Sequence, residues 1–138
     1  MKDFRQEHPL VLVVDDERQV LEEVTAVLAA AKIACHCCTT SEEALDAVQE
    51  VPPDLILCDV NLQGESGLDL YDRIRSRPGL EQVPVMLLSG TQLPDIIRRS
   101  HTVGGIYCLR KPFAPNVLVE LIDQALGVQE AVTDACSS

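Results

Sequence analysis

Polar residues that could do chemistry follow four short, largely apolar runs of this 138-residue chain. They are Asp15, Asp16, Asp59, Ser89 and Lys111. Taken alone, each has an ordinary structural explanation, because aspartate and serine cap helices and lysine is a common solvated charge. Together they supply three carboxylates, a hydroxyl and an ammonium group, so their chemistry depends on whether the fold gathers them.

Three neighbouring carboxylates repel one another unless a cation lies between them. Carboxylate oxygens suit Mg²⁺, which keeps several waters and accepts one or two protein carboxylates plus a phosphate oxygen. A hydroxyl and an ammonium group opposite the carboxylates would stabilise a phosphoryl group during transfer. A carboxylate can itself act as the nucleophile and become an aspartyl phosphate. The set therefore predicts a Mg²⁺-dependent phosphoryl-transfer site.

The chain alternates short apolar runs with amphipathic segments. The runs predict strands at residues 10–14, 33–38, 55–58, 85–88 and 106–110, and the periodic segments predict helices at 17–31, 41–49, 68–75, 94–101 and 114–126. Five strands alternating with five helices predict an α/β fold with a parallel, doubly wound sheet covered on both faces. The polar residues would then meet at the carboxyl ends of the strands, where such sheets bind ligands.

The same pattern sets the expected domain limits. Residues 1–9 are largely polar and are predicted to be an N-terminal extension of one globular domain at 10–127. Gly127 is expected to end the last helix, and residues 128–138 are predicted to be a disordered tail.

Composition excludes several classes of function. Hydrophobic residues make up 46% and charged residues 24%, which is typical of a folded, soluble chain. No apolar run reaches the ~20 residues of a membrane span, and no signal peptide is evident, so we expect a cytoplasmic protein without membrane association. The net charge of −11 and the aromatic content of 3% argue against direct nucleic acid binding.

The six cysteines do not resemble a disulfide framework, because they concentrate in predicted core strands. We expect them to be reduced. Cys35-His36-Cys37-Cys38 could suggest a metal site, but in a strand Cys35 and Cys37 face one way while His36 and Cys38 face the other. No second Cys/His pair follows at zinc-finger spacing, so a packed strand is the favoured interpretation.

The motifs around the polar residues resemble those of response-regulator receiver domains of two-component signalling. The matching segments are VLVVDDE with Asp15 and Asp16, LILCDVNLQGESGLDL with Asp59, VMLLSG with Ser89, and LRKPF with Lys111. The resemblance extends from about Leu10 to Leu126. It implies a flavodoxin-like sheet with strand order 2-1-3-4-5.

The resemblance also implies a role for each site residue. Asp59 would accept the phosphoryl group from a histidine kinase or a histidine phosphotransfer protein. Asp16 and Asp59 would bind Mg²⁺ directly, Asp15 would act through water, and the Asn61 backbone carbonyl would be a further metal ligand. The family is a phosphorylation-controlled signalling module, whose only catalysis is its own phosphorylation and slow dephosphorylation.

Further family features map onto this chain. Ser89 would hydrogen-bond one phosphoryl oxygen and Lys111 would pair with another. Gly67 matches the glycine that ends the loop after the phosphoacceptor, and the Lys111–Pro112 peptide bond is expected to be cis. Phosphorylation would change the surface presented to an unknown output partner, and a homodimer through the fourth helix, fifth strand and fifth helix is an expected possibility.

Two positions depart from the family pattern. Gln63 replaces a proline four residues after the phosphoacceptor, and Cys108 occupies the position of the family's switch aromatic, with Tyr107 one residue earlier. A shift of one residue places Tyr107 on the opposite face of its strand, so we expect it to pack as a fixed residue beneath a flanking helix. A β-bulge just before Lys111 would restore the usual facing.

Two other functions share parts of this pattern. A small Mg²⁺-dependent phosphatase or phosphotransferase of the haloacid dehalogenase type would also form an aspartyl phosphate. Such enzymes want a second acid two residues after the nucleophile, where this chain has Asn61, and usually carry a cap domain. A flavodoxin-like cofactor binder would need a phosphate-cradling loop and stacking aromatics, which the sequence lacks.

Overall fold

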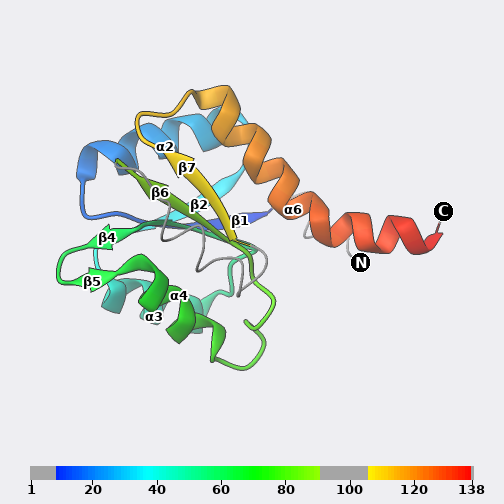
Figure 1. The fold of residues 1–138 in the computed structure, drawn as a ribbon, viewed down its shortest axis with the longest axis horizontal. Coiled ribbons are helices and arrows are strands. Elements are labelled where there is room, and N and C mark those ends of the chain that lie inside the picture. The colour runs from blue at the N-terminus through cyan, green and yellow to red at the C-terminus, as the bar shows by residue number, and fades with distance from the viewer. Residues whose placement is uncertain (1–8, 91–105, 138) are drawn as a thin grey trace.

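A five-stranded parallel sheet forms the centre of the computed structural model, which describes residues 9–90 and 106–137 (Figure 1). Its strand order is β2-β1-β3-β6-β7, so the predicted order 2-1-3-4-5 is confirmed. The strands are β1 (Leu10–Val14), β2 (Ala34–Cys38), β3 (Leu55–Asp59), β6 (Val85–Ser89) and β7 (Ile106–Arg110). All five predicted strands are present, with ends within one residue of those expected.

Helices cover both faces of the sheet, as predicted for a doubly wound fold. They are α2 (Arg18–Ala30), α3 (Ser41–Glu50), α4 (Gly67–Arg75) and α6 (Pro115–Ser137). Figure 1 shows α2 and α6 on one face and α3 and α4 on the other. The helix predicted at residues 94–101 lies outside the described residues. None of the described helices is long and apolar enough to span a membrane.

Alternating side chains of the strands build two apolar cores, one on each face. In β1, Val11 and Val13 pack toward α2 and α6, whereas Leu12 and Val14 pack toward α3 and α4. The strands β1, β3 and β6 are almost entirely buried because helices cover both of their faces. This rigid centre fixes the positions of the residues that follow each strand.

The end predicted for the last helix is wrong. Helix α6 continues through Gly127 to Ser137, beyond the end expected for the last helix. A glycine inside a helix costs only about 1 kcal/mol relative to alanine, and the helix formers Gln129, Glu130 and Ala131 follow it. Gly127 therefore weakens the helix without ending it.

The loop predicted after β3 contains a small hairpin. Strands β4 (Asn61–Leu62) and β5 (Glu65–Ser66) pair antiparallel across a turn at Gly64. Gly64 has a φ of 73°, a left-handed conformation that suits glycine. The hairpin shapes the chain between Asp59 and α4.

The cysteines are free thiols throughout the part of the chain that the structure describes. Their placement differs from the expected core location in one strand. Because β2 is an edge strand, Cys37 is exposed and Cys35 is only partly buried, while Cys38 is buried. Cys58 is fully enclosed, and burial raises the pKa of its thiol well above the ordinary value.

Candidate functional site

Lys111 joins the acidic residues at the carboxyl edge of the sheet. Its Nζ lies 2.8 Å from Oδ2 of Asp59, 2.9 Å from Oδ2 of Asp15 and 3.3 Å from Oε1 of Glu17. The Lys111 backbone N–H donates to the Ser89 carbonyl at 2.7 Å, which holds the residue at the end of β6. We call Asp15, Glu17, Asp59 and Lys111 the acidic site.

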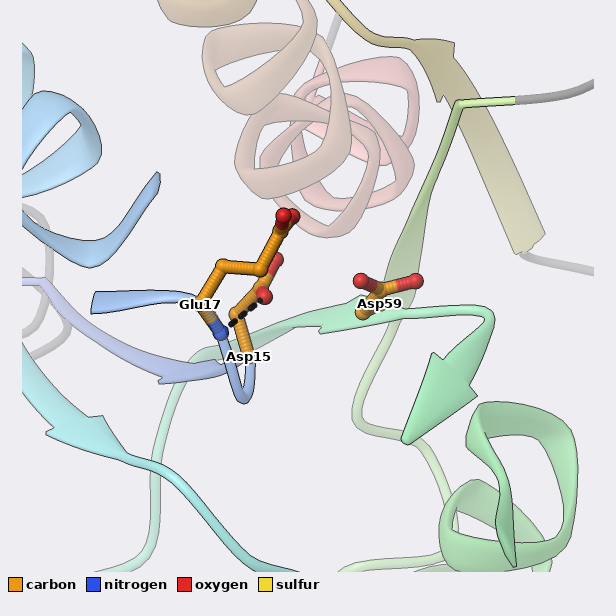
Figure 2. A group of neighbouring side chains, drawn as sticks. All are labelled: Asp15, Glu17 and Asp59. Atoms are coloured by element: carbon orange, nitrogen blue, oxygen red, sulfur yellow. Dashed lines mark hydrogen bonds between the residues drawn. The ribbon is translucent and has the colours of Figure 1, made fainter. Parts of the chain in front are cut away.

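Backbone hydrogen bonds orient the two aspartates toward the lysine. Oδ1 of Asp15 accepts from the Glu17 N–H at 2.9 Å, and Oδ1 of Asp59 accepts from the Asn61 N–H at 2.9 Å. Each aspartate therefore turns its other oxygen, Oδ2, toward Lys111. Figure 2 shows the Asp59 side chain on one side of the site and those of Asp15 and Glu17 together on the other.

Burial makes the charges of this site interact strongly. Asp15 is 0% exposed and Asp59 is 8% exposed. Burial raises the pKa of Asp15, although hydrogen bonding to Lys111 and to the Glu17 backbone opposes the shift. Burial alone would lower the pKa of Lys111, but its hydrogen bonds and ion pairs with Asp59 and Asp15 outweigh this effect and raise it above its usual range. Lys111 therefore remains an ammonium group at neutral pH.

The donor set fits a hard divalent cation. Carboxylate oxygens of Asp15, Glu17 and Asp59 all lie within 4.8 Å of one another. Three carboxylates face one ammonium group, which leaves the acidic site with excess negative charge when all are ionised. Oxygen ligands at this spacing and with this charge suit Mg²⁺, which needs few protein ligands.

The predicted site residues divide into three groups. Asp15, Asp59 and Lys111 are brought into direct contact, and Ser89 is buried at the same edge of the sheet. Asn61 follows Asp59 and holds its carboxylate. Asp16 does not belong to the cluster of three neighbouring carboxylates. The third member of that cluster, beside Asp15 and Asp59, is Glu17.

Glu17 was missed as a site residue. The sequence pattern predicts only a helix start at Glu17, where an acidic side chain needs no further explanation. In the structure it precedes α2 as the N-cap residue, and its backbone N–H and side chain both reach the site. Its position as the third acid in Asp15-Asp16-Glu17 was the available signal.

The sequence profile of the response regulator receiver domain family matches residues 11–123. This chain belongs to that family. Among curated relatives, the sensory/regulatory protein RpfC of Xanthomonas campestris pv. campestris (strain 8004) is 30% identical over 128 residues, which cover 91% of this chain and 18% of that protein. The DNA-binding response regulator MtrA of Mycolicibacterium smegmatis is 34% identical over 121 residues, covering 87% of this chain and 51% of MtrA.

Solved structures agree with this membership. The chemotaxis protein CheY4 of Vibrio cholerae superposes with a TM-score of 0.81 at 26% identity, covering 86% of this receiver and 99% of CheY4. The receiver domain of NtrX from Brucella abortus gives a TM-score of 0.77 at 28% identity, covering 84% and 97% of the two chains. The receiver spans about half or less of the length of the curated relatives above.

The displaced aromatic of this receiver faces as predicted. Strands β6 and β7 pair in continuous register from Val85 and Ile106 to Ser89 and Arg110, without a bulge. Tyr107 packs against the core on the α2 and α6 side, whereas Cys108 packs against the core on the α3 and α4 side. Side chains alternate along β6, so Ser89 shares the face of Cys108 and not that of Tyr107.

Two backbone features expected from the family are also present. The Lys111–Pro112 peptide bond is cis. Gly67 lies directly behind Asp59, and its N–H donates to the Val60 carbonyl at 2.7 Å. A Cβ at Gly67 would collide with the carbonyl oxygen of Asp59 and lie 3.1 Å from the Cys58 sulfur.

We predict that Gly67→Ala destabilises the receiver by about 1–3 kcal/mol, because the added methyl group meets backbone that cannot move freely. The free energy of unfolding in urea measures the loss. Gly90→Ala is the matched control, since a Cβ there meets no atom of the described residues within 4 Å, and we expect it to change stability by no more than about 0.5 kcal/mol. Equal stability of the two variants would contradict this account of Gly67.

Proposed function

We propose that Asp59 is the phosphoacceptor of this receiver and that it takes a phosphoryl group from a histidine kinase or a histidine phosphotransfer protein. The observation that carries the proposal is the buried Asp59 carboxylate held 2.8 Å from the Lys111 ammonium group beside two further carboxylates. Members of this family are phosphorylation-controlled signalling modules. The acidic site lies where the strand ends of this receiver converge.

The residues support a simple transfer step. A carboxylate oxygen of Asp59 attacks the phosphorus of a phosphohistidine, the nitrogen–phosphorus bond breaks, and the histidine leaves. Lys111 is placed to pair with a phosphoryl oxygen because its ammonium group already contacts Asp59. A bound Mg²⁺ would supply additional positive charge to the phosphoryl oxygens.

Ser89 and Asn61 are proposed as supporting residues. Ser89 is buried at the end of β6, and its carbonyl accepts from the backbone of Lys111, so its hydroxyl belongs to the same edge of the sheet. We assign it the hydrogen bond to a phosphoryl oxygen. The Asn61 backbone carbonyl is assigned to Mg²⁺ because its N–H already fixes the Asp59 side chain at the start of β4.

Partner and location are proposed at the level of the family. A histidine kinase or a histidine phosphotransfer protein would supply the phosphoryl group. We place this receiver in the cytoplasm, together with that donor. The phosphatase alternative is disfavoured because position 61 offers Asn61 where a general acid would be required. Part of the expected homodimer face, residues 94–101, lies outside the described residues, so the homodimer stays a prediction.

Incubation with an acyl phosphate and Mg²⁺ is expected to add one phosphoryl group to the chain, and Asp59→Asn is expected to abolish this because an amide is not a nucleophile here. The measurement is the intact mass of the protein. Asp72→Asn, at an exposed position on α4, is the matched control and should be labelled as the native chain is. Undiminished labelling of Asp59→Asn would overturn the assignment.

Mg²⁺ is expected to stabilise the fold because it relieves repulsion within the acidic site. At an ion concentration about 100-fold above Kd, the gain in unfolding free energy is about 2.7 kcal/mol. Thermal melts with and without Mg²⁺ measure it. We expect Asp16→Asn to lose most of the gain, as the family pattern implies, and Glu17→Gln to reduce it, as its position beside Lys111 implies.

Glu22→Gln is the control for this series, because Glu22 is exposed on α2 outside the acidic site. Its response to Mg²⁺ should equal that of the native receiver. A native melting temperature that is unchanged up to about tens of millimolar Mg²⁺, well above the range of water-rich Mg²⁺ sites, would exclude the proposed metal site.

Tyr107 is expected to keep its place on the α6 side when Asp59 is phosphorylated, because the register of β7 points it away from Ser89. Nuclear Overhauser contacts between its ring and the methyl groups of the core on the α2 and α6 side should persist. Tyr71, on the opposite face, serves as the internal reference. New contacts from the Tyr107 ring to Leu87 after phosphorylation would show that this aromatic acts as the family's switch after all.

A further inference from the structure

Two thiols stand side by side on the edge strand of the sheet. Cys35 and Cys37 are two residues apart in β2, so their side chains point to the same side of the strand. Cys35 packs against the core beneath α2, while Cys37 is exposed. The strand pairs with β1 on one side only, and no described strand covers its other edge. The pair is therefore reached from solvent through Cys37, while Cys35 is partly buried.

One hydroxyl holds both thiols together. Oγ1 of Thr25, on α2, lies 3.2 Å from Sγ of Cys37 and 3.8 Å from Sγ of Cys35. The two sulfurs and the hydroxyl oxygen thus form one compact group, preorganised by a helix and a strand that belong to the rigid part of the fold.

The electrostatics of the pair favour a bound cation over two free thiolates. Burial raises the pKa of Cys35, and a negative charge on Cys37 would raise it further. Both effects oppose formation of a second thiolate beside the first. A cation between the sulfurs would remove that repulsion.

We propose that Cys35 and Cys37 form a binding site for a soft, thiophilic metal ion, and that Cu⁺ is the ion their donor set fits best. Thiolates select soft ions. Zn²⁺ requires four ligands in a structural site, and His36 and Cys38 lie on the opposite side of the strand. No described group of three possible ligands includes a cysteine, whereas Cu⁺ is satisfied by two thiolates.

The reaction is a ligand exchange without a redox step. Each thiol loses its proton to water and forms one sulfur–copper bond, so one Cu⁺ releases two protons and leaves a complex with one negative charge. An internal disulfide is the weaker alternative for these residues. Positions two apart on a strand have Cα atoms about 6.4–6.8 Å apart, at the upper limit of disulfide geometry.

The test uses the full reduced chain under anaerobic conditions, with Cu⁺ supplied in competition with a chromophoric Cu⁺ chelator. One tightly bound ion is expected, visible in the native mass and in the ultraviolet absorption of the thiolate–copper bonds. Cys35→Ser and Cys37→Ser should each lose it. The double variant Cys108→Ser/Cys136→Ser is the control and should retain it, since those residues lie outside the pair.

The pH dependence separates two-thiol from one-thiol binding. Release of two protons predicts that the apparent affinity rises about 100-fold per pH unit below the thiol pKa values, against about tenfold for a single thiol. Circular dichroism of each serine variant verifies that it is folded. Retention of the tight site in folded Cys37→Ser, its loss in the control variant, or a tenfold pH dependence would each overturn the proposal.

Discussion

The ammonium group of Lys111 is the interaction on which the site depends. Asp15 and Asp59 are buried, and a buried carboxylate is costly unless it is paired and hydrogen-bonded. Lys111 contacts both, and in doing so it connects the chain after β7 with the ends of β1 and β3. In the sheet order, β6 lies between β3 and β7, so only a long side chain can reach across its end.

The pairing is incomplete, and this incompleteness is chemically useful. Lys111 neutralises one negative charge, while Glu17 adds a third carboxylate to the two aspartates. A site that was fully neutral would have little affinity for a cation. The excess negative charge therefore favours binding of a divalent cation at this edge of the sheet. That ion and Lys111 would together counter the negative charge of an incoming phosphoryl group. The cost is that repulsion among the carboxylates lowers the free energy of unfolding when no ion is bound.

Apolar runs made the sheet predictable, because β1, β3 and β6 are buried on both faces and leave no polar residue within them until each strand ends. The polar residues at those ends were predictable for the same reason. Glu17 was not, because helical periodicity explains an acid at that position completely. The hairpin of β4 and β5 was missed because two-residue strands carry no periodic pattern. The end of α6 was missed because a single glycine weakens a helix by less than its neighbours stabilise it.

The register of β7 places a physical limit on how this receiver can report its state. Because β6 and β7 pair without a bulge, a shift of one position in the sequence becomes a change of face in the fold. The aromatic ring of Tyr107 therefore lies on the side of α6. The face shared with Ser89 carries the small thiol of Cys108 instead. A rearrangement at Ser89 therefore cannot be coupled to the filling of a large pocket by an aromatic ring on that face. Any effect of such a rearrangement would have to pass through the backbone at Ser89 and Gly90, without a side-chain toggle on that face.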